Sequence, residues 1–197
     1  QGQDREQVDE MVNALCRNNQ QRAAAIVLLA RATGMRLREA ILADLPRLSR
    51  EANDLGKINI QDGTKGGRAG ASAPRWIAGD DHIRDALGFA SQASPAGSRN
   101  LIAPNESYLN LLQESIRSAR DILHAHNLKG FHELRAAYAC ERYEQITLHP
   151  APINSGQCCQ VDRNLDREAR WQISCELGHG RIDVVADLPP VLVPLPS

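Results

Sequence analysis

The sequence predicts a mainly α-helical domain of the α+β class, with one small antiparallel β-sheet. Three observations lead to this prediction. Apolar residues recur at helical spacing along most of the chain, a short stretch after Gly56 alternates polar and apolar residues, and aromatic residues make up 4% of the composition. A length of 197 residues fits one domain with a buried core. We expect this domain to span residues 1–187 and residues 188–197 to form an irregular, proline-rich tail.

Three helices are expected before the sheet. Residues 7–17 place valine, methionine and leucine on one helical face, and residues 21–32 are almost entirely Ala, Ile, Val and Leu between arginines, which predicts a buried helix. Gly34 is suited to cap that second helix, because glycine readily adopts the left-handed conformation. A third, short helix is expected over residues 36–43, and it should stop before Pro46.

The sheet is expected between residues 56 and 78, after the third helix. Two short strands joined by a glycine-rich turn account for the alternation there. Further helices are predicted over residues 81–91, 106–125, 131–146 and 166–177. The helix at 106–125 should present one apolar face, formed by Leu109, Leu112, Ile116, Ala119 and Leu123.

Composition argues against several classes of protein. No stretch has the roughly 18 apolar residues of a membrane span, and five cysteines without a CxxC pair are typical of reduced thiols in a cytoplasmic protein. A zinc site built from Cys158, Cys159, Cys175 and His179 has no regular ligand spacing, and the glycines near Lys65 do not form a phosphate-binding P-loop. We therefore expect no metal, no cofactor and no small-molecule substrate. The net charge of −1 counts against nucleic-acid binding, unless basic residues gather locally.

Four separated motifs stand out. They are Ala32–Ala40, which contains Arg36 and Glu39; Thr64–Gly67 with Lys65; His132-Glu-Leu-Arg135; and Leu177-Gly-His179. Each alone has an ordinary structural explanation, such as a surface arginine, a turn lysine or a capping histidine. Together, in this order and spacing and in a helix–hairpin–helix context, they resemble the catalytic domain of the tyrosine recombinases, the phage integrase family. The resemblance covers about residues 7–185.

The resemblance implies a catalytic role for five residues and a supporting role for Glu39. The five are Arg36, Lys65, His132, Arg135 and His179, and they are expected to converge on one concave surface. In this family they act on a phosphate of double-stranded DNA during site-specific recombination of a mobile element, with other recombinase subunits bound to the same DNA.

The chemistry of strand cleavage explains these residue types. Transesterification places charge on the non-bridging phosphate oxygens, and two guanidinium groups such as Arg36 and Arg135 can each donate paired hydrogen bonds to them. His132, one helical turn before Arg135, can bond the phosphate or transfer a proton. Lys65 is suited to protonate the leaving 5′-oxygen, and His179 to donate one more hydrogen bond.

The nucleophile of the family is missing from its expected position. The family places a tyrosine about nine residues after the histidine that His179 matches, and here that position is Leu188, followed by two prolines. Tyr108, Tyr138 and Tyr143 all lie upstream, and Tyr138 is expected to pack in the core with its hydroxyl bonded. No tyrosine is therefore assigned as the nucleophile, and no covalent 3′-phosphotyrosyl complex is expected.

Three explanations for the missing tyrosine remain open. They are a frameshift or truncation near Val185, natural loss of cleavage in a DNA-binding relative, and a tyrosine supplied by a different partner subunit. Two other functions also remain. One is a DNA-binding regulator that keeps the phosphate clamp but never cuts, and the other is a helical interaction module in which the motifs are coincidental.

Overall fold

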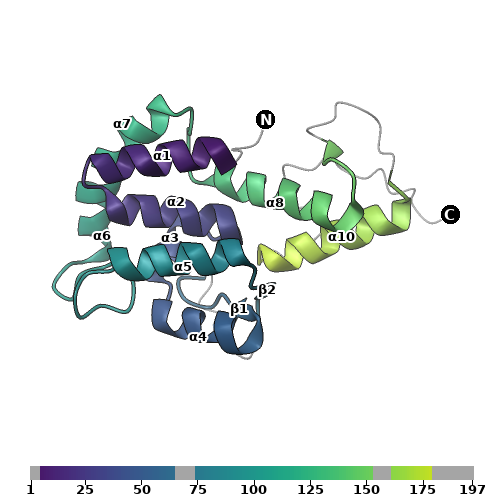
Figure 1. Ribbon diagram of the computed structural model, residues 1–197, viewed down its shortest axis with the longest axis horizontal. Coiled ribbons are helices and arrows are strands. Elements are labelled where there is room, and N and C mark those ends of the chain that lie inside the picture. Colours follow the sequence, from purple (N-terminus) through teal and green to yellow (C-terminus); the bar gives the residue numbers. More distant parts are fainter. Residues whose placement is uncertain (1–4, 65–73, 153–160, 179–197) are drawn as a thin grey trace.

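The computed structural model describes residues 5–64, 74–152 and 161–178, and these form a mainly helical molecule with a small antiparallel sheet (Figure 1). The first half contains α1 (Arg5–Arg17), α2 (Gln21–Thr33), α3 (Leu37–Leu42), α4 (Leu45–Leu55), β1 (Lys57–Asn59) and β2 (Trp76–Ala78). The second half contains α5 (Asp81–Ala93), α6 (Tyr108–Leu111), the π-helical turn η2 (Leu112–Ile116), α7 (Arg117–Ala125), α8 (His132–Thr147) and α10 (Arg163–Glu176). The α+β class expected from the sequence is confirmed.

Helix α2 forms the centre of the core. Its residues from Ala23 to Val27 are completely buried, as are Leu29 and Ala30, because α1, α5 and α8 all pack against it. Figure 1 shows α1, α2 and α5 side by side, with α8 leading away toward α10. The run of small and branched apolar residues thus forms an almost completely buried helix, as the sequence predicted.

The sequence prediction missed α4, so the sheet follows a fourth helix. Pro46 is expected to stop the third helix, but it lies in the first turn of α4, where the missing N–H has no intrahelical partner to lose. Asp44 is the N-cap, and its carboxylate accepts a hydrogen bond from the Arg47 backbone N–H at 3.1 Å. Gly56 ends the helix with a φ of +65°.

The helix expected over residues 106–125 begins at Tyr108 and is interrupted by the π-turn η2. A π-turn contains one more residue than an α-turn, so it rotates the residues before it relative to those after it. Ile116, Ala119 and Leu123 are buried as expected, whereas Leu109 is 63% exposed and Leu111 is buried instead. The predicted apolar face was therefore wrong at its first position.

The predicted strands pair in antiparallel register, with Lys57 opposite Ala78, Ile58 opposite Ile77 and Asn59 opposite Trp76. Ile58 and Ile77 are buried, while the Lys57 ammonium stacks on the exposed Trp76 ring at 4.7 Å. The turn with Lys65 lies outside the described residues. Among the helices in the described ranges, none is long and apolar enough to cross a membrane.

Candidate functional site

Three motif segments meet at Gly34, the residue that ends α2. Gly34 has a φ of +71°, and its N–H caps the helix on the Ala30 carbonyl. A Cβ added to Gly34 would lie 2.7 Å from a side-chain carbon of Leu177 and 2.7 Å from the Tyr138 ring. Gly34 is thus required both by backbone conformation and by close packing, since the ends of α2 and α10 and the side of α8 share this point.

Arg135 bonds to backbone on both sides of this junction. Its Nη1 donates to the Gly34 carbonyl, and its Nη2 donates to the Leu177 carbonyl at 3.2 Å. The guanidinium therefore satisfies a carbonyl at the end of each helix, a place where the carbonyls lack intrahelical donors. Its side chain is 12% exposed. Burial lowers the pKa of Arg135 to about 10, together with the positive charges of Arg36 and Arg75, so it remains charged near neutral pH.

Glu39 is a completely buried carboxylate at the centre of a cluster of arginines. As the third residue of α3 it reaches back to the start of the helix, where its Oε1 accepts from the Arg36 backbone N–H at 3.3 Å and from Arg36 Nη1 at 3.0 Å. Its Oε2 accepts from Arg75 Nη1, and Arg135 Nη1 lies 3.9 Å from Oε1. Glu39 is therefore hydrogen-bonded to both the backbone and the side chain of Arg36.

Sequence reasoning did not single out Arg75. It directly precedes β2 and is 5% exposed, and its Nε donates to the Glu176 carbonyl at 2.5 Å. A signal was available in the alternation of the strand, since Arg75 falls on the same side as the buried Ile77. An arginine on the core side of a strand requires a buried anionic or polar partner, which here is Glu39.

The arginine cluster, defined as Arg36, Arg75 and Arg135 around Glu39, carries three positive charges and one negative charge. Burial is the main cause that lowers the pKa of Arg75, with Arg36 contributing and Glu39 opposing. This excess of positive charge favours binding of an anion, because an anion would compensate the repulsion between the guanidinium groups. Guanidinium geometry suits a phosphate in particular.

A family model described as Integrase matches residues 1–141. The chain belongs to the phage integrase family of tyrosine recombinases. The match includes Arg36, Glu39 and Arg135 and ends within α8. No curated protein and no solved structure matches the chain. Membership of the integrase family speaks against coincidental motifs in an unrelated helical interaction module.

Of the five residues expected to converge, the structure places Arg36 and Arg135 close together, both beside Glu39. His132 is the first residue of α8, one turn before Arg135 as expected, but it is exposed and its ring lies against Gly130. Lys65, His179, Leu188, the Cys158–Cys159 pair and the tail 188–197 lie outside the described residues.

Two of the three tyrosines, Tyr138 and Tyr143, are engaged in structural contacts. The Tyr138 hydroxyl donates to Glu176 Oε2 at 2.7 Å, and that of Tyr143 donates to Asp166 Oδ1 at 2.6 Å; both tyrosines are buried. Burial, and secondarily the Glu176 carboxylate, raises the pKa of Tyr138 well above its ordinary value. The prediction that Tyr138 packs in the core with its hydroxyl bonded is confirmed.

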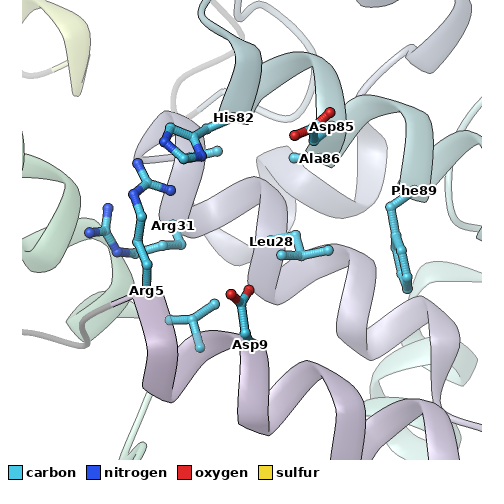
Figure 2. Close-up of a pocket in the computed structure, with 10 residues that line it drawn as sticks. Arg5, Asp9, Leu28, Arg31, His82, Asp85, Ala86 and Phe89 are labelled. Carbon is cyan, nitrogen blue, oxygen red and sulfur yellow. The ribbon is translucent and has the colours of Figure 1, made fainter.

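A hollow of about 320 Å³ lies between α1, α2 and α5 (Figure 2). Figure 2 shows Arg5 and Arg31 close together on one side of it, with Phe89 on the opposite side. Both arginines donate to the Glu141 carboxylate, at 2.6 and 2.5 Å. The residues of the arginine cluster are not part of this lining, so the hollow is a separate feature.

Proposed function

We propose that this chain is the catalytic domain of a site-specific DNA recombinase, in which Arg36 and Arg135 bind one phosphate of double-stranded DNA. The observation that carries the proposal is the meeting of separated motifs. Arg36 at the start of α3 and Arg135 of α8 both lie close to Oε1 of one buried carboxylate, Glu39. Family membership makes DNA the natural partner, and the excess positive charge supplies the attraction.

The two arginines suit the charge that develops during strand cleavage. In the transition state of phosphoryl transfer, the non-bridging oxygens carry more negative charge than in the ground state, so donors held in place stabilise that state preferentially. Glu39 fixes Arg36 through a hydrogen bond at 3.0 Å, and the carbonyls of Gly34 and Leu177 fix Arg135. Preorganised donors of this kind contribute about 10²–10³ in rate each.

The remaining roles follow the family resemblance. Lys65 would protonate the leaving 5′-oxygen, His132 would bond the phosphate or transfer a proton, and His179 would donate to the phosphate. The Leu177 carbonyl accepts a hydrogen bond from Arg135, and His179 comes only two residues later in the sequence. For His132 to take part, its imidazole must turn from Gly130 toward the bound phosphate.

We further propose that this chain binds DNA but has no tyrosine of its own with which to cleave it. Leu188 stands where the family's nucleophile is expected, and a leucine cannot form the 3′-phosphotyrosyl bond. The hydroxyls of Tyr138 and Tyr143 donate hydrogen bonds to buried carboxylates. A pKa raised well above its ordinary value disfavours the tyrosinate of Tyr138.

The test is binding of a fluorescein-labelled 30-base-pair duplex, measured by fluorescence anisotropy over a series of salt concentrations. Arg36→Ala should weaken binding roughly tenfold, because a hydrogen bond to a charged group contributes about 1.5–3 kcal/mol. It should also reduce the slope of log K against log salt by about 1, the value for one lost phosphate contact.

The matched control is Arg117→Ala, which removes one exposed arginine of α7 and gives the same net charge. Equal losses for Arg36→Ala and Arg117→Ala would contradict a phosphate site at the cluster, since binding would then depend on overall charge alone. A suicide substrate with a nicked strand should give no covalent adduct on a denaturing gel. An adduct that mass spectrometry maps to Tyr108, Tyr138 or Tyr143 would refute the non-cleaving assignment.

A further inference from the structure

Arg75 is the most deeply buried guanidinium of the arginine cluster, and it has hydrogen-bonding capacity to spare. Its Nη1 donates to Glu39 and its Nε to the Glu176 carbonyl. Its Nη2 is buried and has no hydrogen-bond partner among the described residues. Burying an arginine is unfavourable unless its charge is compensated. The charge of Arg75 is compensated by Glu39, so the two residues must be considered as a pair.

The ion pair between Arg75 and Glu39 determines which other arginines can bond to the Glu39 carboxylate. Arg75 takes Oε2, while Oε1 accepts from Arg36, and Arg135 Nη1 remains 3.9 Å away, beyond hydrogen-bonding distance. Arg135 donates hydrogen bonds to the carbonyls of Gly34 and Leu177. Without Arg75, the buried carboxylate would lose its closest counter-charge. It would then attract Arg36 and Arg135 more strongly, and a DNA phosphate would have to compete with it for both groups.

Arg75 is also fixed by two other parts of the molecule. Its backbone N–H donates to Asn59 Oδ1 at 2.9 Å, and its carbonyl accepts from the Ile60 N–H at 3.0 Å, which continues the ladder of the sheet. A Cβ added to Gly178 would lie 3.2 Å from Arg75 Cδ, so the side chain packs against the turn that follows α10. The guanidinium is therefore held at Glu39 by the sheet and by α10 together.

We propose that Arg75 is a positioning residue of this recombinase, which neutralises Glu39 and so weakens the competition of this carboxylate with a DNA phosphate for Arg36 and Arg135. The inference rests on the proposed function, because it assumes that the cluster binds DNA. Arg75 acts through Glu39, without a contact to the phosphate. With it, the cluster has an excess of two positive charges; without it, the excess is one.

The experiment compares duplex binding by the full chain, by Arg75→Met and by the double variant Arg75→Met/Glu39→Gln. Methionine keeps an unbranched apolar stem but has no charge. Arg75→Met should weaken binding about tenfold or more, because it exposes Arg36 and Arg135 to an unbalanced carboxylate. Glu39→Gln removes that carboxylate charge, so the double variant should bind within about threefold of the wild type.

A purely structural role of Arg75 would not give this rescue by the double variant. If Arg75 merely held the fold together, replacing its partner as well would leave binding as weak as in Arg75→Met, or weaker. A double variant that binds more than about tenfold more weakly than the wild type therefore overturns the inference. Circular dichroism and urea unfolding of each chain identify variants that do not fold.

The remaining outcomes also decide the question. If Arg75→Met does not fold, the double variant carries the test, since it has no unpaired buried charge. If the double variant also fails to fold, Arg75 is needed whatever the charge of Glu39, and the inference is overturned. Binding that depends on Arg36 but is unchanged in Arg75→Met overturns this inference alone. A wild-type chain that does not bind the duplex overturns the proposed function as well.

Discussion

Replacing Gly34 with alanine should destabilise the protein through two separable effects. Gly34 has a φ of +71°, and an L-residue in that left-handed conformation costs roughly 1–2 kcal/mol. The added Cβ would also lie 2.7 Å from both Leu177 and Tyr138, closer than real Cβ contacts, and overpacking of this kind costs roughly 1–3 kcal/mol. Gly34→Ala should therefore lower the free energy of unfolding by about 2–5 kcal/mol.

Gly56→Ala is the matched control for this change. Gly56 ends α4 with a φ of +65°, but a Cβ placed there has no atom within 4 Å, so only the conformational cost of roughly 1–2 kcal/mol applies. Urea unfolding followed by circular dichroism measures both variants. Equal destabilisation of the two, within about 0.5 kcal/mol, would refute the close packing of α2, α8 and α10 at Gly34.

Two further predictions concern other parts of the chain. Asp44→Ala should cost about 1 kcal/mol in urea unfolding, because it removes the N-cap of α4; an unchanged midpoint would contradict the cap. Burial opposes ionisation of Glu141, but hydrogen bonds from Arg5 and Arg31 lower its pKa below the ordinary value of 4.5. The ionised Glu141 therefore stabilises the fold above pH 4.5, and this contribution is lost as the pH falls through the lowered pKa. Glu141→Gln should therefore be less stable than the wild type at pH 7, and this difference should shrink on acidification; a difference that is constant from pH 7 to pH 3 would refute the assignment.

The positions of most helices could be predicted from local pattern. Helix α2 is buried throughout because nearly all its residues are apolar, and Gly34 ends it because its left-handed conformation is accessible to glycine. Pro46 shows the limit of such rules, since the same residue stops a helix from inside and begins one in its first turn. Asp44, two residues earlier, was the signal that could have distinguished the two cases.

Some residues of the candidate site could likewise be predicted from local sequence, and one could not. Arg36, Glu39 and Arg135 could be proposed from their motifs, because the spacing of Arg36 and Glu39 alone allows the ion pair at 3.0 Å within one helical turn. Arg75 could not be assigned to the site from its neighbours. Its partners are Glu39, 36 residues away, and the Glu176 carbonyl, 101 residues away, and these are brought to it by the sheet and by α10.

The sequence by itself determined the class of fold, the family resemblance and the local pairing of Arg36 with Glu39. It could do so because helical periodicity, helix caps and contacts within one turn depend on residues close together in the chain. Only the tertiary structure decided that Gly34, Tyr138 and Leu177 share one point and that a third arginine joins the cluster. Those contacts depend on how separate helices pack, and the partner of a buried charge is set by that packing.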